Sequence, residues 1–169
     1  MNIQEIESSL KALQKQVTVL EKAIKEFKEN SKPKTIYDLR DGDKYWVVGY
    51  DGAINGCTFF DSYSDKKIIE IGSAFLTEEE AKYEIKCREV YTQLKKYSYD
   101  FSYEEWKNGN ILKYFLNYIA DQNYIKINSC YHLNCSALYF KTKENAQLAI
   151  DEVGKENIIK YYFKIRDYQ

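Results

Sequence analysis

The sequence predicts an α+β protein in which an N-terminal coiled-coil helix precedes a domain built on a mainly antiparallel sheet. Apolar residues recur in heptads through residues 1–29, which is typical of an oligomerisation helix. The polar linker 30–35 contains the one proline, Pro33, and a proline ends a helix because it lacks the backbone N–H. Residues 36–169 alternate strand-like aromatic runs with capped helical segments, so we expect an aromatic-rich α+β domain there.

Size and composition indicate a folded chain without a membrane segment. Of 169 residues, 44% are hydrophobic and 30% charged, which suits one globular domain plus a helix. No apolar run reaches the roughly 18 residues of a spanning helix, and no signal peptide begins the chain. Four cysteines are too few for a disulfide scaffold, and a net charge of −1 creates no field that attracts nucleic acid. We expect a cytoplasmic protein with no membrane partner.

The heptad pattern consists of eight apolar residues whose spacings alternate between three and four. Mostly β-branched residues at the a positions, with leucines at d positions, favour a parallel dimer. The g positions carry no charge and no buried Asn fixes the register, so a trimer or an antiparallel pair stays open, as does packing of the helix on its own domain. The residues expected to form the homo-oligomer are Ile3, Ile6, Leu10, Leu13, Val17, Leu20, Ile24 and Phe27.

The first half of the domain is expected to begin with a β-hairpin. Asp51-Gly52 lies between two apolar runs, which predicts a strand over residues 44–50 and a returning strand that ends at Phe60. We interpret residues 61–65 as a loop and residues 67–75 as a further strand. A capping box formed by Thr77 and Glu80 then opens a helix that ends near Lys96.

The second half has a similar order of elements. The expected elements are strands over 111–119, 124–131 and 137–140, a short helix with Trp106 capped by Ser102, a helix from Thr142 to about Gly154, and a helical turn and last strand over 156–165. Thr142 follows Thr77 by 65 residues, so segments 44–96 and 111–154 can be aligned as an internal repeat. Chance similarity between two strand and helix units explains this alignment as well as duplication does.

Four segments carry a family resemblance, namely 41–46, 71–81, 113–118 and 153–163. Through them, residues 36–165 resemble small uncharacterised proteins encoded by phages and prophages of Gram-positive bacteria. The resemblance implies an accessory phage protein that acts in the bacterial host cell, where some such proteins blunt host defence. The shared motifs are turns and helix caps, so the resemblance implies no functional residues.

No motif specifies a reaction, a cofactor or a metal. Cys130, His132 and Cys135 lie close in sequence, yet their spacing is not that of a zinc knuckle. His132 is the only histidine, and nothing local marks a nucleophile beside it. Phosphate-binding glycine loops are absent from the sequence. We therefore expect a protein that is not an enzyme, with no catalytic residue, no metal site and no cofactor.

Tyrosines are unusually numerous, with 17 in the chain, and surface tyrosine is enriched at binding interfaces. Ordinary sheet packing and stacking on nucleotide bases are the competing uses of these rings. The candidate binding residues are Tyr97, Tyr99, Trp106, Tyr114, Tyr118, Tyr124 and Tyr161.

The sequence thus favours a non-enzymatic phage-type protein that oligomerises and binds and inhibits a bacterial host protein. An anti-CRISPR-like or other anti-defence inhibitor is the sharpest form of this hypothesis, and it rests on the family resemblance together with the lack of catalytic motifs. Sequestration of a small nucleotide signal and a structural or assembly role in the virion are the alternatives.

Overall fold

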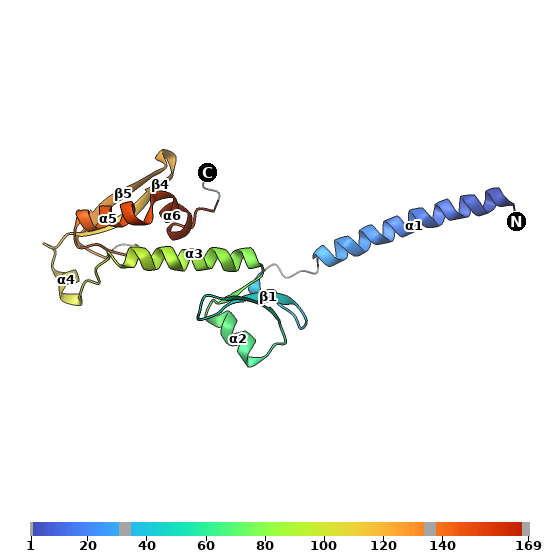
Figure 1. Ribbon diagram of the computed structural model, residues 1–169, viewed down its shortest axis with the longest axis horizontal. Coiled ribbons are helices and arrows are strands. Elements are labelled where there is room, and N and C mark those ends of the chain that lie inside the picture. The colour runs from blue at the N-terminus through green and yellow to red at the C-terminus, as the bar shows by residue number, and fades with distance from the viewer. Residues whose placement is uncertain (1, 31–34, 134–137, 167–169) are drawn as a thin grey trace.

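The computed structural model describes residues 2–30, 35–133 and 138–166, and it forms an α+β fold with two small antiparallel sheets. Helix α1 (Ile3–Asn30) projects away from all other elements (Figure 1), and its side chains are described for residues 2, 3 and 7–24. The predicted N-terminal helix is therefore confirmed. Most of the predicted linker, residues 31–34, lies outside the described part of the chain.

Residues 36–75 form a small sheet unit, which we call the first unit. Its elements are η1 (Ile36–Asp38), β1 (Lys44–Val48), β2 (Ile54–Thr58), α2 (Tyr63–Glu70) and β3 (Ala74–Phe75). The strand order is β2-β1-β3, with both pairings antiparallel, and Gly52 has a positive φ of 81° in the predicted hairpin turn. Three buried residues, Tyr45, Phe59 and Ala74, form its core, so little apolar surface stabilises this unit.

Helix α2 corrects the prediction of a loop over 61–65 and a long strand over 67–75. Ser62 begins the helix because its hydroxyl accepts a hydrogen bond from the Asp65 N–H (3.2 Å), while the Asp65 carboxylate accepts one from the Ser62 N–H (3.0 Å). Ile68 and Ile69 suggested a strand, but they lie on α2 and pack against the core of the first unit. Only Ala74 and Phe75 remain as strand.

Asp65 is the polar centre of the first unit. Besides its contacts with Ser62, its carboxylate accepts a hydrogen bond from the Tyr45 hydroxyl (2.7 Å) and one from the Phe60 N–H (3.1 Å). These donors, Tyr45 foremost, lower the pKa of Asp65 from 3.8 to about 2. Burial is the main cause that raises the pKa of Tyr45, so the hydroxyl stays a donor. The charged carboxylate thus ties α2 to β1.

We expect the first unit to lose stability as the pH falls from about 4 to about 2. The pKa of Asp65 is lower in the folded than in the unfolded chain, so its contribution is complete above the unfolded pKa and is lost as the pH falls through the folded pKa. Amide hydrogen-exchange protection of β1 across this range would measure the effect. An Asp65→Asn variant should lack this pH dependence, and an unchanged profile in that variant would contradict the assignment.

Residues 78–163 hold the remaining described helices and the second sheet. Their elements are α3 (Glu78–Lys95), α4 (Tyr103–Lys107), β4 (Lys113–Ile119), η2 (Ala120–Gln122), β5 (Tyr124–Cys130), α5 (Lys143–Val153), α6 (Lys155–Asn157) and the π-helix η3 (Ile158–Tyr162). Strands β4 and β5 pair antiparallel, as the hairpin prediction requires. Thr77, Ser102 and Thr142 cap α3, α4 and α5 with their side chains, which confirms these three predicted helix starts.

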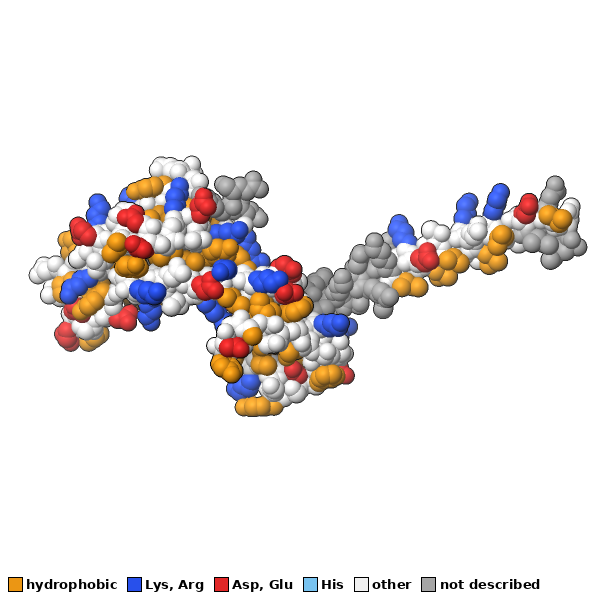
Figure 2. Space-filling view, viewed as in Figure 1, with side chains coloured by type: hydrophobic (Ala, Val, Ile, Leu, Met, Phe, Trp, Pro, Cys, Tyr) orange, Lys and Arg blue, Asp and Glu red, His pale blue; other side chains and the backbone are white. Residues whose placement is uncertain are grey.

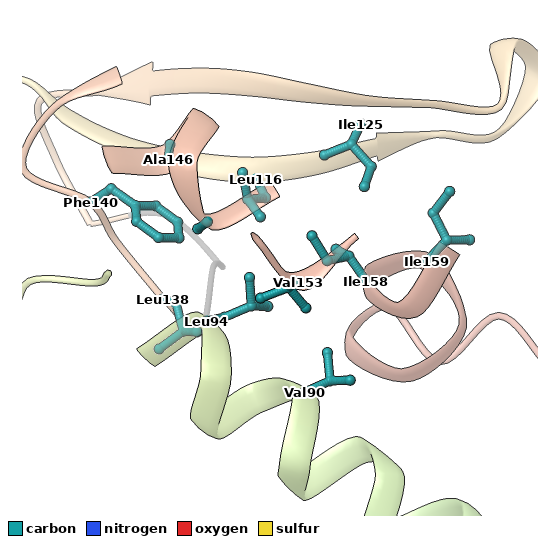
Figure 3. Close-up of a cluster of buried hydrophobic side chains, with 11 residues drawn as sticks. Val90, Leu94, Leu116, Ile125, Leu138, Phe140, Ala146, Val153, Ile158 and Ile159 are labelled. Carbon is teal, nitrogen blue, oxygen red and sulfur yellow. The ribbon is translucent and has the colours of Figure 1, made fainter. Parts of the chain in front are cut away.

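The second core is the larger one and lies between β4–β5, α5, α3 and η3 (Figure 3). Phe140 is fully buried in it, and the C-terminal half of α3 contributes Val90 and Leu94. Phe140 pairs with Tyr114 through an isolated β-bridge. Of the strand predicted over 137–140, residue 137 lies outside the described residues, and only Phe140 pairs.

The C-terminal segment differs from the predicted strand. Residues 158–162 form η3, and the described chain continues to Arg166 without a strand. Ile158 and Ile159 are both fully buried although they are adjacent. Neighbouring residues of a strand point to opposite faces, whereas the helical segment η3 places Ile158 and Ile159 in the same core. The β-branched and aromatic composition therefore misled the strand prediction.

Candidate functional site

The apolar stripe of α1 is a row of exposed hydrophobic side chains along one helix. Each of its described side chains is at least 53% exposed, and Figure 2 shows them along one side of the helix with lysines along the other. The side chains of Ile6 and Phe27 lie outside the described residues. None of the described helices combines the length and apolarity needed to cross a bilayer. The described stripe residues are Ile3, Leu10, Leu13, Val17, Leu20 and Ile24.

The first unit exposes a set of aromatic side chains that the sequence did not single out. Tyr37, Tyr50, Phe60 and Tyr63 are each at least 65% exposed, and we call them the first-unit aromatics. Tyr50 borders the hairpin turn, whereas Phe60 and Tyr63 flank the N-cap of α2. Their positions in the sequence could have predicted this exposure. A ring beside a turn or a helix cap has no sheet face in which it can be buried.

The seven predicted binding residues do not share one surface. Tyr97, Tyr114 and Tyr118 are half-buried and pack against the second core, with the Tyr118 ring stacked on Phe163 at 6.0 Å between centroids. Tyr124 is exposed at the β4–β5 turn. Tyr97, Tyr114 and Tyr118 therefore serve mainly as packing residues of the second core.

Tyr99 and Trp106 belong to an aromatic cluster that encloses a lysine. The Lys113 side chain is fully buried, and its ammonium donates to the carbonyls of Ile111 (2.9 Å) and Tyr131 (3.2 Å). It also lies 5.0 Å from the Trp106 ring centroid. Carbonyl oxygens and an aromatic face satisfy this cation inside the protein. The cluster is accordingly a structural element, and the buried ammonium of Lys113 is not accessible to a ligand.

Tyr161 lines a groove between α3 and the C-terminal segment, which we call the α3 groove. It consists of two hollows of about 330 and 530 Å³ that share Glu84 and Lys164. The smaller hollow reaches the first unit at Phe75 and includes Arg166. The larger one is bordered by Cys87, Arg88, Tyr91, Thr92, Tyr161 and Tyr162.

Glu84 organises the charged side chains of the α3 groove. Its carboxylate is 3.1 Å from Arg88 Nε and 3.4 Å from Lys164 Nζ. On the preceding residue, the Tyr83 hydroxyl donates to the Lys160 carbonyl at 2.6 Å, and the Arg166 guanidinium lies 4.7 Å from the Tyr83 ring centroid. These contacts join α3 to residues 160–166 at several points. The C-terminal segment therefore lies against α3 along the groove.

The titratable groups of this region offer no activated nucleophile. Burial raises the pKa of the Cys87 thiol, so it stays protonated near neutral pH. Among the described residues, no group of three or more His, Cys, Asp or Glu side chains gathers into a metal-binding arrangement. His132 is exposed, and Cys135 lies outside the described part of the chain. The groove is thus equipped for binding by charge and aromatic faces.

Comparison of the chain with protein-family models, with curated proteins and with solved structures finds no match.

Proposed function

We propose that this protein is a non-enzymatic, oligomeric binding protein in which associated α1 helices display several copies of the α+β region. The exposed apolar stripe of α1 is the observation that carries the proposal. A stripe with an unbroken heptad period is stabilised when a second helix covers it, and an uncovered stripe of this length would aggregate. A second copy of the chain has an α1 helix with the same heptad period and the same length, so it can cover the stripe.

The binding partner in this proposal is a bacterial host protein, which the oligomer inhibits. The first-unit aromatics support a protein partner, because tyrosine and phenylalanine are enriched at protein interfaces. The resemblance of residues 36–165 to phage and prophage proteins supports inhibition of a host defence protein of the anti-CRISPR or a related kind. Several linked copies would raise the avidity for a partner that is itself multimeric.

Replacing Tyr50 and Tyr63 together by Ser is expected to weaken partner binding by about tenfold or more, because exposed aromatic anchors dominate interface energy. The full-length protein and the double variant would each be used to capture proteins from a Gram-positive cell lysate. The captured protein would then be identified and its affinity for both chains measured.

The matched control is Tyr103→Ser, which removes a tyrosine of α4 that is also strongly exposed. The control should bind the identified protein as the unchanged chain does. Equal affinity of the double variant and the unchanged chain would place the binding surface elsewhere. Failure to capture any protein whose function the full-length chain inhibits would count against the proposed function itself.

A further inference from the structure

The α3 groove lies where the first unit, α3 and the C-terminal segment meet. Small-molecule sites occur preferentially at such junctions, in hollows of about 300–1,000 Å³. The two hollows of about 330 and 530 Å³ fall in this range, and Glu84 and Lys164 line both of them. This groove does not include the α1 stripe or the first-unit aromatics. A ligand bound in it is therefore independent of the proposed function.

Three cations and two carboxylates line the groove as a whole. Lys164, Arg166, Glu80 and Glu84 line the smaller hollow, whereas Arg88 lines the larger one, and Glu84 contacts Arg88 and Lys164. The other lining carboxylate, Glu80, accepts hydrogen bonds from the backbone N–H groups of Leu76 and Thr77 and so belongs to the cap of α3. Within the described residues, no carboxylate lies at ion-pair distance from Arg166. Arg166 is therefore the cation of the smaller hollow that can take an anionic ligand, and Lys164 lines the same hollow and can share it.

The backbone conformation at Lys164 is unusual for a lysine. Lys164 has a φ of +57°, and among the described residues the other non-glycine residues with positive φ are Asp61 and Asn123. Asp and Asn tolerate the left-handed region far better than Lys does. Lys164 follows closely after the π-helix η3, a rare conformation that recurs at functional sites. Lys164 directly follows Phe163, the C-cap of η3, and a left-handed residue at this position ends many helices. The turn leaves Lys164 lining both hollows of the groove.

The larger hollow supplies aromatic faces. Tyr91, Tyr161 and Tyr162 line it, together with the buried thiol of Cys87 and with Thr92. Tyrosine rings stack on planar ring systems with little dependence on the identity of the ring. We propose that the α3 groove binds a small ligand made of a planar ring and a phosphate group, of the nucleoside monophosphate class. The ring lies against the tyrosines, and the phosphate lies between Lys164 and Arg166.

Lys164→Gly tests this proposal because it separates binding from stability. Glycine adopts a positive φ without steric cost, so the variant should be at least as heat-stable as the unchanged protein. Removing the charged donor should weaken binding by about ten- to a hundredfold. Isothermal titration calorimetry of the full-length chains with AMP, GMP, CMP and UMP measures the affinity, and Tm measures the stability. Arg166→Gln is the second loss variant.

Adenosine and inorganic phosphate each carry half of the proposed ligand and should bind at least about tenfold more weakly than the best monophosphate. Lys126→Gln removes a lysine from the β4–β5 hairpin, outside the groove, and should leave the affinity unchanged. The proposal is overturned if none of the four monophosphates binds at millimolar concentration. It is also overturned if both groove variants bind as the unchanged protein does, or if Lys126→Gln alone abolishes binding. None of these three results would bear on host-protein capture.

Discussion

Val17→Asp is expected to convert the oligomer into a monomer, whereas Val19→Asp is expected to leave the oligomer intact. Val17 occupies an a position of the heptad pattern, and Val19 lies two residues further, outside the a and d positions. In the single chain both side chains are exposed, at 53% and 67%, so neither change removes a contact within one copy. An unpaired carboxylate buried in every helix of the oligomer would cost on the order of 3–5 kcal/mol.

Sedimentation equilibrium measures this effect directly, since one chain has a mass of 20.1 kDa. The unchanged protein and Val19→Asp should give the same multiple of this mass, and Val17→Asp should approach the single-chain value. The two substitutions are chemically identical on the same helix, which removes helix propensity as an explanation. A monomeric unchanged protein, or equal masses for the two variants, would contradict association through the stripe.

Phe140→Ala is expected to lower the free energy of unfolding of the second core by about 3–5 kcal/mol, because it leaves a cavity the size of a phenyl ring. Phe140 is fully buried and joins β4, through Tyr114, to the core that α3 and α5 share. Urea unfolding followed by circular dichroism gives the free energy. The denaturant dependence should stay the same if both chains unfold in the same manner.

Phe60→Ala is the matched control, because it removes the same ring from an exposed position. Its effect on unfolding should stay within about 0.5 kcal/mol. Comparable losses for Phe60→Ala and Phe140→Ala would show that the second core is packed differently from the arrangement in Figure 3.

Local chemistry made a large part of the fold predictable. Asp51-Gly52 placed the first hairpin, and Thr77 and Thr142 placed two helix starts, because each of these signals acts within a few residues of the chain. At α2 two local signals disagree. The capping pair Ser62 and Asp65 indicates a helix start, whereas the isoleucines that follow favour a strand, and the structure has the helix. Isoleucine is common in strands, so both these isoleucines and Ile158 and Ile159 suggested strands. In the structure, all of them pack on a core from helical segments.

The candidate sites were less predictable, because exposure and convergence depend on tertiary structure. Tyr97, Tyr114 and Tyr118 look like surface residues in the sequence, yet they pack on the second core. In the α3 groove, Glu84 contacts Lys164, which lies 80 residues later in the chain. A pattern of neighbouring residues cannot predict a contact between residues so far apart in sequence. The heptad stripe is the exception, since its period is written into consecutive residues.

Helix α3 has a practical consequence for dissecting this protein into fragments. Its N-terminal half contacts β1, β2 and β3, while its C-terminal half belongs to the core that α5 and η3 complete. A fragment that ends before Glu78 would present the three-stranded sheet without the helix that packs on it, and one that begins there would expose the fully buried Ala81. The two sheets are thus not separable modules, and truncation after residue 30 is the cut that leaves both cores whole.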